Sequence, residues 1–228
     1  MQNKIILLAI FIGSFLLMSF LKDTRGRKKK VLFFGDSITQ MGVEPGGYIS
    51  VMKDMLAKEG NDGYELIGSG IGGNKVYDLY LRMREDVIAQ SPDITLVYVG
   101  VNDVWHKSLF GTGTDADKFE KFYRAIIKDL KAAGSKVILV TPATIGEKKD
   151  YSNQQDGDLN KYSQIIRNIA ADNDIPVCDL HTIFHNYEVD HNTENADRGI
   201  LTTDGVHLND TGNRLVASEM WKIIKEIK

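Results

Sequence analysis

Short apolar runs alternate with amphipathic stretches from residue 31 to the end of the chain. The runs are a few residues long and are mostly followed by glycine or polar residues, which is typical of strands buried on both faces of a parallel sheet. We predict five such strands, at residues 31–35, 64–67, 94–99, 137–140 and 177–180. Between them, apolar residues recur with helical spacing, as in the stripe of Phe119, Ile126 and Leu130. We predict helices at residues 48–58, 76–89, 118–132, 159–171 and 210–227.

This alternation of strands and helices predicts an α/β fold in one domain, residues 31–228. We expect a three-layer α/β/α sandwich around a five-stranded parallel sheet, with right-handed crossovers. In such a sheet, ligands bind outside the carboxyl ends of the strands. Small and polar residues interrupt the apolar pattern at three of these ends, at residues 35–37, 68–74 and 100–103. The chemistry of the protein is therefore expected there.

The first 30 residues differ from the rest of the chain. Residues 5–21 contain no charge and no proline, and a basic stretch, residues 22–30, follows them. Seventeen residues are marginal for a bilayer core that needs about 20, and long for the apolar region of a signal peptide. We interpret them as a signal or membrane anchor that places the protein in the cell envelope or periplasm, with residues 22–30 as a linker. Positive charge after the apolar run favours a cytoplasmic side instead, so the orientation stays open. A buried core helix is the alternative.

Composition narrows the class of protein. The chain has 228 residues, of which 43% are hydrophobic, enough for one sizeable core. Its single cysteine, Cys178, excludes an intramolecular disulfide and a cysteine-ligated zinc or iron–sulfur site. Seven of the 28 Lys and Arg residues lie in residues 1–30, so the remainder carries 21 basic against 30 acidic residues, a net charge of −9. Because that charge repels phosphate backbones, we expect no nucleic-acid partner.

Ser37 follows the first predicted strand, in the sequence FFGDSIT. A serine just beyond a buried strand is exposed at the edge of the sheet, where a carbonyl carbon can approach it, so Ser37 is a candidate nucleophile. Asp36 and Ser37 are equally suited to capping a helix. Taken alone, these residues leave both roles open.

Glycines follow the second predicted strand. Gly68, Gly70 and Gly73 form a Gly-x-Gly-x-x-Gly pattern between a strand and a helix, as in dinucleotide-binding folds. The acidic residue that such folds carry about 20 positions further on is missing, because the next strand ends at Gly100. Glycines at this place can also let backbone N–H groups approach a developing oxyanion, which is the interpretation we favour.

Three further polar residues complete a candidate catalytic set. Asn102, after the third strand, can donate a hydrogen bond to an oxyanion without titrating, although it could equally hold a turn. Asp204 and His207 lie three residues apart, across a glycine, in TTDGVHLND. This spacing lets the carboxylate bind one imidazole nitrogen and leaves the other free as a general base towards a serine. In isolation, the pair would more often be a turn with a surface histidine.

In this order, GDSIT (35–39), a glycine-rich block, GVND (100–103) and DGVHLN (204–209) resemble the SGNH hydrolases, the GDSL-like esterases and lipases. The resemblance extends from residue 31 to nearly the C-terminus. The segment TPATIGE (141–147) is similar to the corresponding segment of family members that cleave small esters. The resemblance implies a flavodoxin-like SGNH hydrolase fold and the activity of a serine esterase.

The resemblance also implies roles for individual residues. Ser37 would be the nucleophile, His207 the general base, and Asp204 the acid that orients His207. The oxyanion hole would consist of the backbone N–H groups of Ser37 and Gly70 and the side chain of Asn102. The family usually has Asn at the position of Gly68, so a neighbour of Gly70 remains an alternative donor.

The acyl transfer of such a triad needs neither metal nor cofactor, and we expect none. His181 and His185 lie near Asp179 and His191, which could suggest a metal. No third ligand is fixed by spacing, so we interpret these histidines as surface or loop residues.

The sequence says less about the substrate than about the type of reaction. The chain has no long apolar insertion that could form a lipid-binding cap, and an exported esterase without one favours a short acyl group. We expect a small-molecule or glycan ester, such as an acetylated carbohydrate. A lysophospholipase or thioesterase, which an N-terminal anchor would suit, and a non-catalytic glycan-binding module are the alternatives. Trp105 and Tyr151 could line the substrate mouth or simply pack at the rim.

Overall fold

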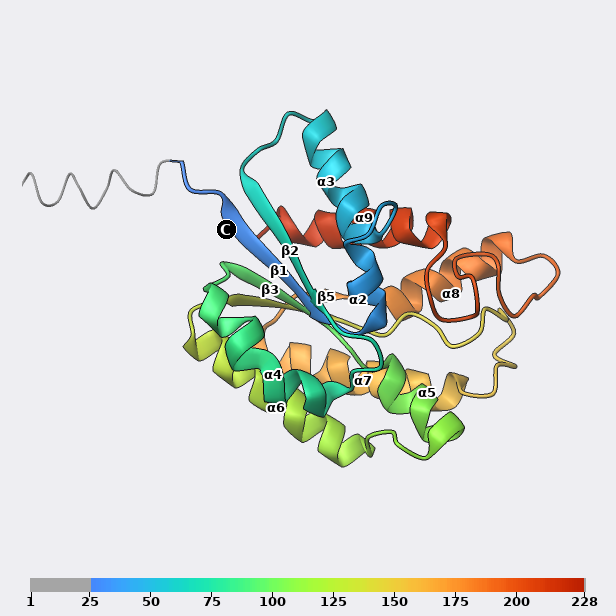
Figure 1. Cartoon of the computed structure of the whole chain (residues 1–228). Helices are drawn as coiled ribbons and strands as arrows, with labels where there is room; N and C mark the ends of the chain where they lie inside the picture. Colours follow the sequence, from blue (N-terminus) through green and yellow to red (C-terminus); the bar gives the residue numbers. More distant parts are fainter. Residues whose placement is uncertain (1–25, 228) are drawn as a thin grey trace, which may run out of the picture.

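The computed structural model describes residues 26–227, which form a five-stranded parallel sheet with helices on both faces (Figure 1). The strands lie in the order β2-β1-β3-β4-β5. They are β1 (Lys29–Gly35), β2 (Tyr64–Gly70), β3 (Ile94–Tyr98), β4 (Lys136–Val140) and β5 (Val177–Cys178). The three-layer α/β/α fold predicted from the sequence is confirmed.

Two helices, α3 (Tyr48–Lys58) and α9 (Asp210–Ile224), pack together on one face of the sheet (Figure 1). The other face is covered by α4 (Val76–Asp86), α6 (Ala116–Ala132) and α7 (Asp156–Asn173). A 3-10 turn, η1 (Ile88–Gln90), follows α4. Three more helices begin close to the ends of β1, β3 and β5, and so lie at the carboxyl end of the sheet. They are α2 (Ser37–Gly42), α5 (Val101–Phe110) and α8 (Leu180–His191).

The central strand shows why the apolar runs are continuous. β1 pairs with β2 on one side and β3 on the other, and its residues 31–34 have no exposed surface. Because helices cover both faces of the sheet, consecutive side chains are buried and not only alternate ones. The chain passes from β1 to β2 on one side and then to β3 on the other. This reversal of strand order opens a crevice at the carboxyl end, where ligands bind in such sheets.

β1 begins at Lys29, two residues before the start that the sequence predicted. Asp93 explains the difference, because its carboxylate accepts the backbone N–H of Lys30 at 2.7 Å and pairs with Arg27. Lys29 Nζ donates to the carbonyl oxygen of Ile227 at 2.8 Å. The last residues of the predicted linker therefore belong to the folded domain.

Helices α2, α5 and α8 are missing from the sequence prediction. α2 has only six residues, which is too short to show a helical repeat. α5 starts directly after Gly100, whose φ of 137° suits glycine, and buries Asn102 and Asp103 in its first turn. α8 starts after Asp179, which caps it, and buries only Leu180, Phe184 and Glu188. Because polar side chains occupy buried positions in both helices, the apolar spacing that identifies a helix in a sequence is weak there.

Within residues 26–227, no helix combines the length and the apolar character needed to cross a bilayer. The apolar run at residues 5–21, and with it the interpretation as a signal or anchor, lies outside the described residues.

Candidate active site

Ser37 lies at the sharp turn from β1 into α2, at the carboxyl end of the sheet. The Asp36 side chain caps α2 by accepting a hydrogen bond from a backbone N–H of its first turn at 3.0 Å. At Gly35, a Cβ atom would overlap the Thr39 hydroxyl and the Tyr98 carbonyl oxygen, so the turn requires glycine. Asp36 therefore takes the capping role, and half-buried Ser37 is presented at the crevice.

A chain of hydrogen bonds runs from Ser37 to Asp204. Ser37 Oγ lies 2.9 Å from His207 Nε2, and His207 Nδ1 lies 2.7 Å from Asp204 Oδ2. Asp204 Oδ1 accepts the backbone N–H groups of Val206 and His207 at 3.0 and 2.8 Å. Partial burial opposes ionisation, but the hydrogen bonds from His207 outweigh it and hold the pKa of the Asp204 carboxyl below its usual range. An ionised Asp204 favours a proton on Nδ1 and leaves Nε2 free to accept one from the serine.

Asn102 lies in the first turn of α5, with 2% of its surface exposed. Its Nδ2 donates to the carbonyl oxygen of Asn74 at 3.1 Å. The other hydrogen on Nδ2 has no partner among residues 26–227 and remains available for a ligand. Because Asn74 follows β2, this hydrogen bond also joins the ends of β2 and β3.

Gly70 is the last residue of β2, where it is in register with Gly35. A Cβ atom at Gly70 would overlap backbone atoms of α2, so glycine is needed for close packing of β2 against the helix that starts at Ser37. The N–H of Ile71 donates to the Gly35 carbonyl at 3.3 Å. Since successive N–H groups of a strand point to opposite sides, the Gly70 N–H is directed away from β1 and from Ser37.

The turn after β2 offers other backbone donors. The N–H of Gly72 is occupied, because it donates to Gln40 Oε1 at 2.7 Å. A Cβ atom at Gly72 would lie 3.9 Å from the Cβ of Ser37, so this turn passes close to the serine. Gly73 follows with a φ of 76°, and its N–H makes no hydrogen bond to the part of the chain that the structure describes. Gly73 is thus better placed than Gly70 to donate to a ligand.

Trp105 and Tyr151 occupy different places. The Trp105 ring lies beside His207, with centroids 6.1 Å apart and an interplanar angle of 67°. Tyr151 stacks on His185 of α8 and not on the triad. Among the described residues, no three His, Cys, Asp or Glu side chains are grouped so that they could hold a metal ion.

The GDSL-like Lipase/Acylhydrolase family matches residues 33–215, a stretch that contains every residue of this site. The chain belongs to this family. The resemblance to the SGNH hydrolases is confirmed, and the protein is a carboxylic ester hydrolase.

Several relatives of this GDSL hydrolase are named as esterases. An acetylxylan esterase of Geobacillus stearothermophilus is 30% identical over 70% of this chain and 80% of its own. The crystal structure of the acetyl xylan esterase AlAXEase is 61% identical, with a TM-score of 0.85 over 86% of this chain and 99% of that one. Axe2, an acetylxylan esterase from Geobacillus stearothermophilus, gives 27% identity and a TM-score of 0.73 over 87% of this chain and 95% of that one. Catalytic mutants of Axe2 replace a serine, a histidine and an aspartate.

Arg82 organises this site in the GDSL hydrolase, although the sequence analysis missed it. From α4, its guanidinium donates to the Gly35 carbonyl at 2.7 Å, to Ser69 Oγ at 2.9 Å and to Asn74 Oδ1 at 2.7 Å. Arg82 therefore joins the ends of β1 and β2 and holds the residue that binds Asn102. A single arginine on an amphipathic helix looks like a solvated residue, so the sequence alone carries no signal for this role.

Glu147 was missed as well. It is fully buried, and its carboxylate accepts the backbone N–H groups of Ile200, Leu201 and Thr202 at 2.7, 2.7 and 2.6 Å. These residues lie two to four positions before Asp204, so Glu147 fixes the loop that carries Asp204 and His207. The one signal in the sequence was its place at the end of TPATIGE, the segment similar to that of small-ester hydrolases.

Two other buried carboxyl groups lie behind the site. Burial raises the pKa of both Asp36 and Asp103 to about 7. Asp103 accepts the backbone N–H of Val76 at 3.2 and 3.3 Å and so positions the start of α4. Asp204 differs from Asp36 and Asp103, because its pKa is lowered and its carboxylate is hydrogen-bonded to His207.

Proposed function

We propose that this GDSL hydrolase is a serine esterase that removes short acyl groups, chiefly acetyl, from carbohydrates such as xylan. One observation carries the proposal: the hydrogen-bonded chain from Ser37 through His207 to Asp204, in a protein 61% identical to an acetyl xylan esterase. The same three residue types are replaced in the catalytic mutants of Axe2.

In the proposed reaction, His207 Nε2 takes the Ser37 proton while Oγ attacks the ester carbonyl. The tetrahedral intermediate collapses to an acyl-serine, and His207 gives its proton to the sugar oxygen that leaves. A water molecule then attacks the acyl-serine and loses a proton to His207. The carboxylic acid is released and Ser37 Oγ regains its proton. Asp204 orients His207 and stabilises its charged form in both steps.

The developing oxyanion requires donors on one side of Ser37 Oγ. We propose the Ser37 N–H, the free amide hydrogen of Asn102 and, from the turn after β2, the N–H of Gly73. The resemblance had suggested Gly70, but its N–H is directed away from β1, and the N–H of Gly72 is occupied by Gln40. Gly73 satisfies the need for an unoccupied donor in the same turn.

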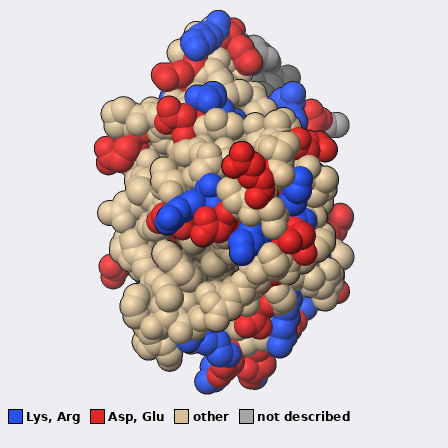
Figure 2. Space-filling view, turned by 90° about the vertical axis from the view of Figure 1, so that its right-hand side faces the viewer, with Lys and Arg blue, Asp and Glu red and all other residues tan. Residues whose placement is uncertain are grey.

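The surface around the site supports a neutral, hydroxylated substrate. Figure 2 shows the face of the molecule at the carboxyl ends of the strands, where Lys, Arg, Asp and Glu side chains are interspersed. A polyanionic substrate would favour a patch of one sign. The mixed charges fit a carbohydrate ester better than a phosphate-bearing substrate.

The nucleophile is tested by Ser37→Ala. We expect hydrolysis of p-nitrophenyl acetate to fall by about 10⁴-fold or more, because a triad member is lost, with no change in Tm. Mass spectrometry of the unmodified chain after a fluorophosphonate probe should show one adduct, on Ser37. Ser108→Ala, an exposed serine of α5, is the matched control and should keep full activity. Unchanged turnover in Ser37→Ala would refute the mechanism.

The acyl group is tested by comparing chain lengths. We expect p-nitrophenyl acetate to be hydrolysed with a higher kcat/KM than the octanoate or laurate ester, and acetate to be released from acetylated xylan. A preference for long acyl chains would support the lysophospholipase or thioesterase interpretation instead.

We also propose that the enzyme works outside the cytoplasm, held or exported by residues 5–21. The support is the uncharged run itself and the extracellular location of polymeric glycans. Protease added to cells with a permeabilised outer layer should digest the folded domain. Protection until the inner membrane is lysed would favour the opposite orientation.

A further inference from the structure

A second cavity of about 690 Å³ lies at the carboxyl ends of β4 and β5. The loop that follows β4, the start of α7 and helix α8 surround it. Its lining includes none of Ser37, Asn102, Asp204 or His207. The cavity is therefore separate from the site described above, although both open at the same end of the sheet.

Glu188 of α8 lines this cavity with 3% of its surface exposed. Its Oε1 has no hydrogen-bond partner among residues 26–227. Burial raises the pKa of its carboxyl to about 8, and the nearby Glu147 and Asp156 add to the effect. At neutral pH the group is thus protonated and uncharged, with both a donor and an acceptor to offer. A buried polar atom without a partner costs stability, and such an atom in a cavity wall indicates a ligand that supplies hydroxyl groups.

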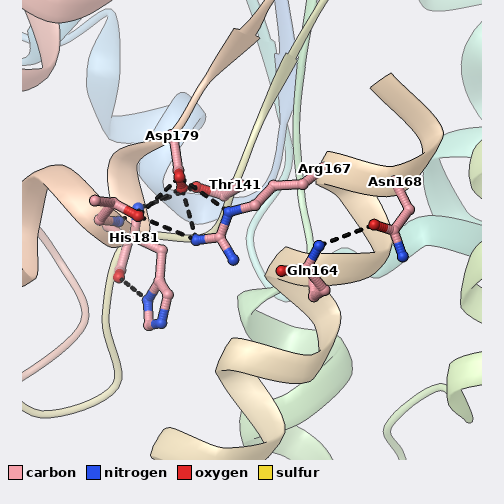
Figure 3. A network of polar contacts seen from close by, with 8 residues as sticks. Thr141, Gln164, Arg167, Asn168, Asp179 and His181 are labelled. Carbon is pink, nitrogen blue, oxygen red and sulfur yellow. Dashed lines mark hydrogen bonds and ion pairs between the residues drawn. The ribbon is translucent and has the colours of Figure 1, made fainter. Parts of the chain in front are cut away.

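Two more polar groups in the cavity wall have unused atoms (Figure 3). His181 Nδ1 lies 3.0 Å from the Ala143 carbonyl and so carries the proton, which leaves Nε2 as an acceptor. Arg167 binds Asp179 through Nε and Nη2, both at 2.9 Å, while its Nη1 makes no hydrogen bond in the described chain. Figure 3 shows the imidazole and the free guanidinium nitrogen on the same side of Asp179.

The charges in the cavity are balanced. Asp179 neutralises Arg167, and burial lowers the pKa of His181, which favours the neutral imidazole. Lys148 and Asp156 bring one charge of each sign to the lining. The cavity therefore offers hydrogen bonds without a net charge, which suits a neutral ligand better than an anion.

Tyr151 provides an aromatic platform at this cavity. Its side chain is 68% exposed, and its ring stacks on His185 with centroids 4.3 Å apart and an interplanar angle of 27°. One face of the ring is thus covered and the other is open. Its φ of 60° is unusual for an aromatic residue, and such conformations persist where the surroundings impose them. An open aromatic face next to uncharged hydrogen-bonding groups matches the apolar faces and hydroxyl rims of a sugar.

We propose that this cavity is a second carbohydrate subsite, in which Tyr151 stacks on a sugar ring and Glu188, His181 and Arg167 bind its hydroxyl groups. The subsite would hold a neutral stretch of the glycan whose ester bond is cleaved at Ser37. The choice of a xylose polymer rests on the proposed function, whereas the binding of a neutral sugar rests on the cavity alone.

The test measures binding without catalysis. Full-length Ser37→Ala protein is titrated calorimetrically with xylohexaose, which carries no acyl group. The double variant Ser37→Ala/Tyr151→Ala should bind xylohexaose about tenfold more weakly than Ser37→Ala, because the stacking contact is lost. Glu188→Met, which is close in shape, should weaken binding similarly and raise Tm, since it removes an unpartnered buried carboxyl. Tyr80→Ala replaces an exposed tyrosine outside the cavity lining; it is the control for Tyr151→Ala and should leave xylohexaose binding unchanged.

Activity separates this proposal from the proposed function. With Ser37 intact, Tyr151→Ala should leave kcat/KM for p-nitrophenyl acetate unchanged and raise KM for acetylated xylan. If Ser37→Ala and the double variant Ser37→Ala/Tyr151→Ala bind xylohexaose equally well, the sugar binds only in the catalytic crevice. This result would contradict the proposed subsite. Absence of xylohexaose binding, or binding of inorganic phosphate in its place, would overturn it too. None of these results would affect ester hydrolysis as such.

Discussion

Asn102 is buried at the start of α5 with one amide hydrogen bound to Asn74 and one free. Because an oxyanion exists only in the transition state, Asn102→Ala should lower kcat on p-nitrophenyl acetate by roughly 10²–10³-fold while KM stays similar. Steady-state kinetics measures both parameters. Asn168→Ala, which replaces an exposed asparagine of α7, is the control and should change neither kcat nor KM. A higher KM with unchanged kcat would make Asn102 a ground-state contact to the substrate instead.

Glu188 should make stability depend on pH in a defined direction. Its pKa in the folded state is about 8, above its ordinary value of 4.5. Between these values the unfolded chain ionises Glu188 while the folded protein keeps it protonated, so stability falls as the pH rises from about 4.5 to about 8. Glu188→Met removes this loss, and its gain in Tm should be larger at pH 8 than at pH 5. Thermal unfolding at the two pH values measures the difference, and equal gains would contradict the raised pKa.

The sequence predicted a residue's place in the site where that residue followed the end of a strand. Ser37 and Asn102 stood out because polar residues interrupted an apolar run, and the structure brings both to one crevice. Arg82 and Glu147 escaped notice because each binds a partner that lies far away in the chain. The Gly35 carbonyl is 47 positions from Arg82, and the Ile200 N–H is 53 positions from Glu147. Nothing in a single sequence records such distant pairs.

At the scale of elements, Glu147 joins the loop after β4 to the loop before Asp204. Glu147→Gln keeps the shape but replaces one acceptor oxygen by a donor facing buried N–H groups, which costs about 1–3 kcal/mol. We expect a lower Tm, by several degrees, and a lower kcat on p-nitrophenyl acetate because His207 is held less firmly. Glu120→Gln, on the solvent side of α6, is the control. A lower Tm with unchanged kcat would limit Glu147 to a structural role.

Apolar spacing predicted the elements whose buried faces are apolar, namely the strands and the long helices α3, α4, α6, α7 and α9. It failed at the short helix α2, and at α5 and α8, where Asn102, Asp103 and Glu188 take buried positions. Asn102, which lies at the catalytic crevice, and Glu188, which lines the second cavity, are therefore among the polar residues that concealed α5 and α8.

At the scale of the whole molecule, the strand order places the chemistry. β1 and β3 are neighbours although β2 intervenes in the chain, so residues 35–37 and 100–103 meet at the point where the order reverses. Helix α9 follows the loop of Asp204 and His207 and packs on α3. This packing helps to keep the C-terminal part of the chain, and with it the catalytic histidine we propose, against the carboxyl end of the sheet.

The border between the N-terminal segment and the domain can be tested by two truncations. Removal of residues 1–25 should leave kcat/KM and Tm unchanged, because the contacts described for the site are made among residues 26–227. Removal of residues 1–30 should lower Tm, since it deletes the Arg27–Asp93 ion pair and the pairing of Lys29 and Lys30 with β2. The site itself begins beyond residue 30, so activity at low temperature should survive both truncations. Thermal unfolding and p-nitrophenyl acetate kinetics compare the two proteins. Equal Tm values would mean that the contacts of Arg27 and Lys30 with Asp93 contribute nothing to stability. The domain would then start at Val31, as the apolar pattern suggested.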